Sequence, residues 1–229
     1  MKVNGIKDVF FDLDHTLWDF DRNSALTFEK IFKLNDVDVL LEHFLTYYEP
    51  INLNYWKLYR EGKVDKDSLR FARLNETFRA INMEVDKELI FKLSDDYITY
   101  LTTYNFLFDN TVELLNYLKK DYNLHIITNG FKEVQHKKLS RSNIQHFFRT
   151  VTNSEMVGVK KPNPEIFNFA LKEAKANVET SIMIGDSYEA DIQGAQNIGM
   201  DVIFFDVRNT PVNNEVKRIN KLIQIKDFL

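Results

Sequence analysis

The chain has 229 residues, with 30 Lys and Arg against 34 Asp and Glu, and it contains no cysteine. The absence of cysteine excludes disulfides, zinc–thiolate sites and cysteine nucleophiles. A net charge of −4 argues against a nucleic acid polymer as partner, because such binding depends on clustered Lys and Arg. No apolar run approaches the ~20 residues that cross a bilayer, and the first residues do not resemble a secretory signal. We therefore expect a cytoplasmic globular protein with no membrane partner.

Short apolar runs that stop at polar residues predict buried strands. The first is Val9-Phe10-Phe11, and three more follow this pattern later in the chain, at residues 124–130, 181–186 and 202–206. Segments of helical periodicity stand beside these three, and one begins with Asn163 as N-cap and Pro164 as its first residue. Alternating strands and helices favour right-handed crossovers and a parallel sheet.

The pattern changes between the first strand and residue 107. Residues 22–106 contain one glycine (Gly62) and one proline (Pro50), and their apolar and aromatic residues recur at helical spacing. We therefore predict an α/β fold with a Rossmann-like parallel sheet core and an inserted all-helical domain. The expected division gives residues 18–106 to the insertion, and residues 1–17 and 107–229 to the core.

The polar residues that follow the strands are the candidates for chemistry, because ligands of open α/β sheets bind outside the carboxyl ends of the strands. Three strands end in Asp12-Leu13-Asp14-His15-Thr16, Thr128-Asn129-Gly130 and Gly185-Asp186, with Asp191 shortly after the last. The loop Gly158-Val159-Lys160-Lys161-Pro162 brings a lysine to the same edge. Four carboxylates, a threonine and an ammonium group are thus predicted to converge.

This collection of charges indicates a metal and a phosphate. Neighbouring carboxylates raise one another's pKa, and a hard divalent cation such as Mg²⁺ relieves the repulsion. One carboxylate acting as nucleophile and another as proton donor would give covalent catalysis in two halves. The lysine and the threonine would hold the oxygens of a phosphoryl group.

Four ordered segments resemble the motifs of the haloacid dehalogenase (HAD) superfamily. They are Asp12-Leu13-Asp14-His15-Thr16, Ile127-Thr128-Asn129-Gly130, Lys160-Lys161-Pro162, and Gly185-Asp186 through Asp191. The helical insertion after the first motif resembles the cap of the first cap subclass, which closes over the site and selects the substrate. Within that subclass the chain is most similar to small bacterial nucleotidases that act on nucleoside 5′-monophosphates, especially pyrimidine ones.

The resemblance assigns a role to each motif residue. Asp12 would be the nucleophile that forms an aspartyl-phosphate, and Asp14 the general acid and base. Thr128 and Lys161, the lysine before the proline, would bind the phosphoryl oxygens. Further substrate contacts are expected from three neighbouring residues, Thr16, Asn129 and Gly130.

The resemblance also implies Mg²⁺ as the cofactor. Asp12, the main-chain carbonyl of Asp14, and Asp186 would hold the ion. Asp191 would bind it through water or orient another ligand. The expected partner is a small phosphate ester.

Several reactions remain open at this point. The first choice is a phosphomonoesterase, most similar to a 5′-nucleotidase, in which Trp18 or Phe20 could stack on a base. A sugar-phosphate phosphatase or a phosphomutase would use the same two aspartates. A 2-haloacid dehalogenase has no leaving-group oxygen to protonate, so the presence of Asp14 argues against it. A phosphoryl-accepting receiver domain would lack the helical insertion.

Overall fold

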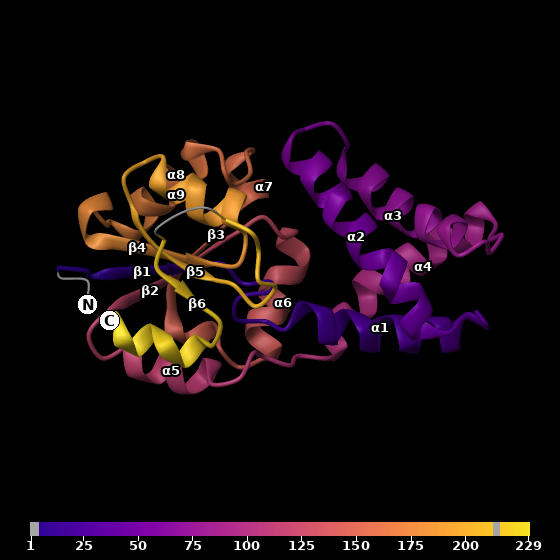
Figure 1. Ribbon diagram of the computed structural model, residues 1–229, viewed down its shortest axis with the longest axis horizontal. Coiled ribbons are helices and arrows are strands. Elements are labelled where there is room, and N and C mark those ends of the chain that lie inside the picture. The colour runs from indigo at the N-terminus through magenta and orange to yellow at the C-terminus, as the bar shows by residue number, and fades with distance from the viewer. Residues whose placement is uncertain (1–4, 213–215) are drawn as a thin grey trace. The chain divides into compact units, whose positions relative to one another are not determined.

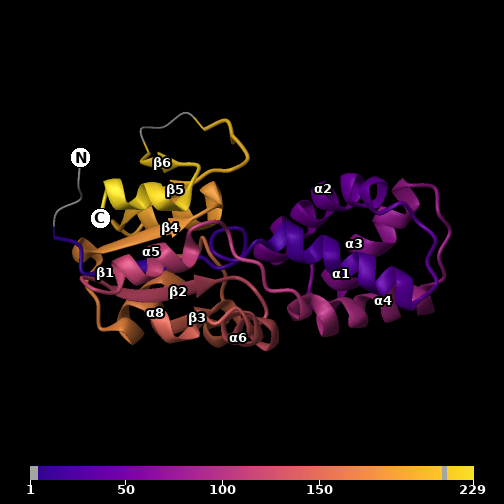
Figure 2. The same ribbon diagram turned by 90° about the horizontal axis from the view of Figure 1, so that it is seen from below.

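The computed structural model describes residues 5–212 and 216–229. Its centre is a parallel sheet of six strands in the order β3-β2-β1-β4-β5-β6, and Figure 2 shows the strands in this order. The strands are β1 (Asp8–Phe11), β2 (Asn123–Thr128), β3 (Phe148–Asn153), β4 (Ser181–Gly185), β5 (Asp201–Phe205) and β6 (Arg218–Ile219). All four residues of the central strand β1 are buried, as expected for a strand covered on both faces.

Helices cover both faces of the sheet. Figure 1 shows α5 (Thr111–Leu118) and the 3₁₀ helix Leu222–Asp227 on one face, and α8 (Pro164–Ala174) and α9 (Gly194–Gln196) on the other. The remaining α-helices of the core are α6 (Lys132–Arg141) and the short α7 (Ser154–Val157). As predicted, α8 begins after the N-cap Asn163, whose side chain accepts a hydrogen bond from the backbone of Glu165.

The inserted segment forms a helical unit of its own. Its helices are α1 (Phe20–Leu34), α2 (Leu41–Arg60), α3 (Lys66–Ala80) and α4 (Lys87–Tyr100). The side chains of Asp65 and Asp86 cap α3 and α4 by accepting backbone hydrogen bonds of 2.7 Å. The unit has its own aromatic core around Phe28, whose ring centre lies 4.6–5.5 Å from those of Phe32, Phe44, Tyr48 and Tyr97.

The predicted fold class is confirmed: the core is a Rossmann-like parallel sheet, and the insertion is helical. The chain divides into two compact units: Asp21–Tyr104 form the helical unit, and the segments before and after it form the core. The predicted insertion was residues 18–106. The four predicted strands are present as β1, β2, β4 and β5, whereas β3 was not predicted. In the described segments, no helix has the length and apolar character needed to span a bilayer.

A buried histidine joins the sheet's central strands. His125 on β2 stacks on Phe10 at 4.6 Å, and its ring nitrogens lie 3.3 Å from Asp8 Oδ1 and 2.8 Å from Thr150 Oγ1. Burial lowers the pKa of His125 below its ordinary 6.5, although Asp8 opposes this.

The free energy of unfolding should therefore decrease as the pH falls below about 6.5, because the unfolded chain then binds a proton that the folded protein excludes. Urea unfolding at pH 7.5 and 5.5 measures the effect. In His125→Gln this part of the pH dependence should disappear, whereas His136→Gln, at an exposed position, should keep it. An unchanged pH dependence in His125→Gln would contradict the prediction.

Candidate active site

Three carboxylates meet at the carboxyl ends of β1 and β4. Phe11 and Ile184 are partners in the parallel register, and the backbone N–H of Asp12 donates to the carbonyl of Ile184 at 2.9 Å. This pairing places the residues after both strands at one edge of the sheet. Asp12, Asp186 and Asp191 each contribute a carboxylate oxygen, and these three oxygens lie within 4.8 Å of one another. We call these three residues the carboxylate cluster.

Asp191 reaches the cluster from a wide helical turn, Tyr188–Gln193. Its side chain is 1% exposed, and its Oδ2 accepts a hydrogen bond of 3.0 Å from the backbone of Ser187. A Cβ atom on Gly185 would lie 2.3 Å from that same oxygen. Only glycine at this position therefore lets the carboxylate approach the strand end.

Lys161 is the cation of the site. Its side chain is 2% exposed, and its Nζ lies 2.6 Å from Asp12 Oδ1 and 2.6 Å from Asp191 Oδ1. Nζ also donates to the carbonyl of Ile127 at 2.7 Å. Asn129 fixes the Lys161 backbone: its Oδ1 accepts from Lys161 N at 2.8 Å, and its Nδ2 donates to the Lys161 carbonyl at 3.0 Å. In the structure, the predicted residue Asn129 thus positions the lysine.

The cluster carries more negative charge than Lys161 neutralises. Burial raises the pKa of Asp12 well above its ordinary 3.8, and Lys161 only partly offsets this. The charges of Asp191 and Asp186 raise the pKa of Asp12 further. Burial also raises the pKa of Asp186 to about 6. Although burial lowers the pKa of Lys161, its acidic neighbours outweigh burial and raise the pKa above 10.5, so the lysine stays charged.

The residues of the cluster fit a hard divalent cation. They offer carboxylate oxygens, which are the ligands that Mg²⁺ prefers. Oδ1 of Asp191 is buried, and the cation beside it, Lys161 Nζ at 2.6 Å, is shared with Asp12. A buried oxygen in that state is costly without a further positive partner. A divalent cation would supply that partner.

The side chain of Asp14 lies outside the cluster. Its Oδ1 is 2.5 Å from Lys138 Nζ, and its Oδ2 accepts a hydrogen bond of 3.0 Å from Gln135 Nε2. The resemblance had assigned its main-chain carbonyl, not this carboxylate, to the metal. The structure therefore separates the carboxylate of Asp14 from the oxygens of the carboxylate cluster.

The remaining predicted residues surround these groups. Thr16 is fully buried, and its hydroxyl donates to Asp186 Oδ1 at 3.3 Å. Oγ1 of Thr128 accepts from the backbone of Gly130 at 3.1 Å and from Gln135 Nε2 at 3.2 Å. A Cβ atom on Gly130 would lie 1.5 Å from Gln135 Nε2, so this glycine makes room for the glutamine.

Two residues of α6 near the site, Gln135 and Lys138, were not among the predicted site residues. They are 1% and 2% exposed, and they share the buried face of the helix with Val134 and Leu139. Burial lowers the pKa of Lys138, and Asp14 opposes this. The available signal was the spacing: positions 134, 135, 138 and 139 form one helical face that mixes apolar and polar residues. Lys138 Nζ lies 4.4 Å from the ring centre of Trp18, one of the two candidates to stack on a base.

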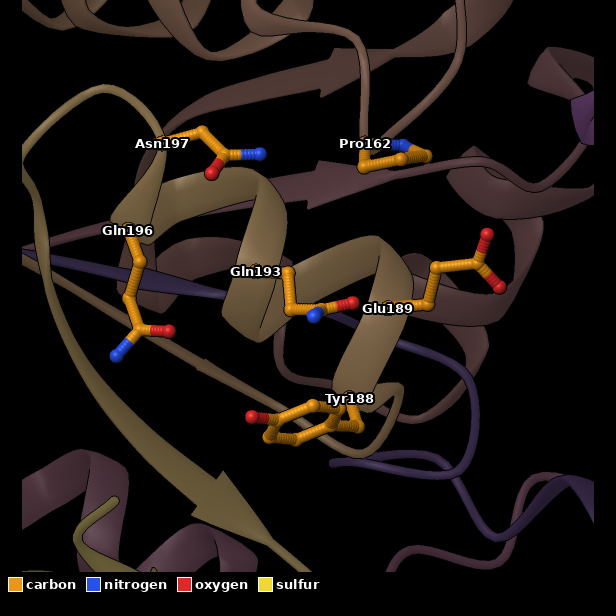
Figure 3. Close-up of a pocket in the computed structure, with 6 residues that line it drawn as sticks. All are labelled: Pro162, Tyr188, Glu189, Gln193, Gln196 and Asn197. Atoms are coloured by element: carbon orange, nitrogen blue, oxygen red, sulfur yellow. The ribbon is translucent and has the colours of Figure 1, made fainter. Parts of the chain in front are cut away.

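A hollow lies beside the site. Figure 3 shows it between the loop of Pro162 and the helical segment that carries Asp191. Its volume is about 350 Å³, and its walls are Pro162, Tyr188, Glu189, Gln193, Gln196 and Asn197. None of the carboxylates of the cluster lines it, so it is separate from the candidate active site.

A parallel sheet whose central strands β1 and β4 end in clustered carboxylates, beside a buried lysine from the loop between α7 and α8, is typical of Rossmann-like α/β enzymes; here the sheet carries an inserted helical domain. The chain belongs to the haloacid dehalogenase-like hydrolase family, whose family model matches residues 9–205. The superfamily resemblance inferred from the four motifs is thereby confirmed, and the protein is a hydrolase.

Alignments with two relatives cover most of the chain. Pyrimidine 5′-nucleotidase YjjG of Escherichia coli K12 is 32% identical over 194 residues, which cover 84% of this chain and 82% of that protein. Glyceraldehyde 3-phosphate phosphatase of Methanothermobacter thermautotrophicus is 33% identical over 236 residues, covering 98% and 100%. Among solved structures, magnesium-bound YfnB of Bacillus subtilis superposes with a TM-score of 0.86 at 28% identity, covering 97% of each chain.

Proposed function

We propose that the protein is a Mg²⁺-dependent phosphomonoesterase that works through an aspartyl-phosphate and acts on nucleoside 5′-monophosphates. The observation that carries this proposal is the ion pair of Lys161 with Asp12 inside the buried carboxylate cluster. This arrangement gives one carboxylate a fixed position at the end of β1, beside a cation that can receive phosphoryl oxygens.

The chain's own residues account for both halves of the reaction. An oxygen of Asp12 attacks phosphorus while the bond to the leaving oxygen breaks, and Asp14 gives its proton to that oxygen. Asp14 then takes a proton from a water molecule, whose oxygen attacks phosphorus and releases Asp12 and inorganic phosphate. Lys161 and the Thr128 hydroxyl hold the phosphoryl oxygens in both halves. Mg²⁺ held by the cluster would neutralise the charge of the phosphoryl group.

The substrate class rests on the relatives. One is named a pyrimidine 5′-nucleotidase, which favours a nucleotide. A second candidate is a short sugar phosphate, because a glyceraldehyde 3-phosphate phosphatase matches over 98% of this chain. Both substrates have an alkoxide leaving group, so the same residues serve both reactions.

A phosphate-release screen with Mg²⁺ tests the choice. It compares dUMP, UMP and AMP with glyceraldehyde 3-phosphate and glucose 6-phosphate. The expected result is a kcat/KM for dUMP or UMP at least about tenfold above that for either sugar phosphate. Preference for a sugar phosphate would overturn the nucleotidase proposal and leave the phosphatase proposal standing. Release of no phosphate from any ester would overturn both.

A further inference from the structure

Both carboxylate oxygens of Asp14 are held by one helix. Lys138 Nζ on α6 donates to Oδ1 at 2.5 Å, and Gln135 Nε2, one turn earlier, donates to Oδ2 at 3.0 Å. Two donors on two different oxygens restrict both side-chain torsions of the aspartate. The side chain of Asp14 is partly exposed, whereas both donors are almost fully buried.

Aromatic rings restrict the lysine. Its Nζ lies 4.4 Å from the ring centre of Trp18 and 5.2 Å from that of Phe20. A lysine ammonium on a flexible four-carbon chain ordinarily samples many positions. Here cation–π contacts and burial leave it beside Asp14.

The glutamine links Asp14 to the second motif. Its Nε2 donates to Thr128 Oγ1 at 3.2 Å as well as to Asp14. Gly130 is the residue that allows this, because a Cβ there would collide with the glutamine amide. The candidate acid–base group and a candidate phosphate-binding hydroxyl are therefore held by one amide.

We propose that Lys138 and Gln135 are positioning residues that hold the Asp14 carboxylate in place for proton transfer at the leaving oxygen. This inference rests on the proposed acid–base role of Asp14. A general acid must lie within hydrogen-bond reach of the atom that it protonates. A displacement of about 1 Å can reduce a rate about 10²-fold.

The test compares two kinds of leaving group. An alkoxide, as in dUMP or glyceraldehyde 3-phosphate, needs a proton to leave, whereas p-nitrophenolate does not. In Lys138→Met we expect kcat/KM for the alkyl phosphate to fall about 10²-fold, and kcat/KM for p-nitrophenyl phosphate to fall by less than about threefold. The control is Lys137→Met, the same change at the exposed neighbouring position, which should alter neither value.

A merely structural role would reduce both values equally. An equal fall for both esters, or no fall for either, overturns the inference. Gly130→Ala supplies a second variant, because its Cβ would collide with Gln135 Nε2 and lie 3.2 Å from Asp14 Oδ2 while Lys138 stays unchanged. It should lower the ratio of alkyl to aryl kcat/KM in the same direction. If Lys138→Met does not fold, an unchanged ratio in Gly130→Ala overturns the inference.

The proposed function is tested separately in the same assay. Hydrolysis of p-nitrophenyl phosphate by the wild-type protein, lost in Asp12→Asn, supports the phosphatase proposal whatever the ratio in Lys138→Met. Activity that persists in Asp12→Asn contradicts the nucleophile itself and not the positioning of Asp14.

Discussion

Replacing Asp12 with Asn should reduce hydrolysis of p-nitrophenyl phosphate by about 10⁴-fold or more, because a neutral amide oxygen is a poor nucleophile for phosphorus. The amide has nearly the shape of the carboxylate, and its oxygen can still accept from Lys161 Nζ, 2.6 Å away in the native protein. The loss should therefore reflect the missing nucleophile. Initial rates of p-nitrophenolate release with Mg²⁺ measure it.

The control for this variant is Asp121→Asn, which makes the same change at an exposed position of the core. Its activity should equal that of the wild type. Circular dichroism and the urea midpoint should show that Asp12→Asn remains folded. Mass spectrometry of the intact protein should exclude deamidation back to aspartate. Full activity in a variant verified in this way would remove Asp12 from the mechanism.

The strands that could be predicted from the sequence are the ones buried on both faces. A strand such as β1 is a continuous apolar run because helices cover both faces of a parallel sheet. In contrast, β3 lies at one edge of the sheet and carries the exposed Arg149 among threonines. Its sequence has no uniform apolar run, so its place in the sheet follows from pairing with β2.

The same distinction applies to the site. The residues after β1, β2 and β4 could be predicted because a strand end fixes where the next residue lies. The partners of Asp14 could not be assigned to it, because Gln135 and Lys138 resemble solvent-facing residues of an amphipathic helix, although they share a helical face with Val134 and Leu139. Their burial depends on where α6 packs and which way Asp14 turns, and both are tertiary properties.

Removal of divalent cations should reduce hydrolysis about 10³-fold, and added Mg²⁺ should restore it. The reason is that Asp12, Asp186 and Asp191 hold three carboxylates together beside one lysine, and an incoming phosphate adds further negative charge. Initial rates in excess EDTA, followed by titration with Mg²⁺, measure the effect. Rates that EDTA leaves unchanged would remove the metal from the proposal.

Binding of the ion should also be visible without any substrate. A ligand that binds only the folded protein stabilises it, by about 2.7 kcal/mol at a concentration 100 times its Kd. We therefore expect Mg²⁺ to raise the thermal unfolding midpoint. Asp186→Asn removes one charged oxygen ligand, so the half-maximal Mg²⁺ concentration should increase about tenfold or more. Asp121→Asn should leave it unchanged, and an equal response in both variants would place the ion elsewhere, because Asp186 is in the cluster and Asp121 is not.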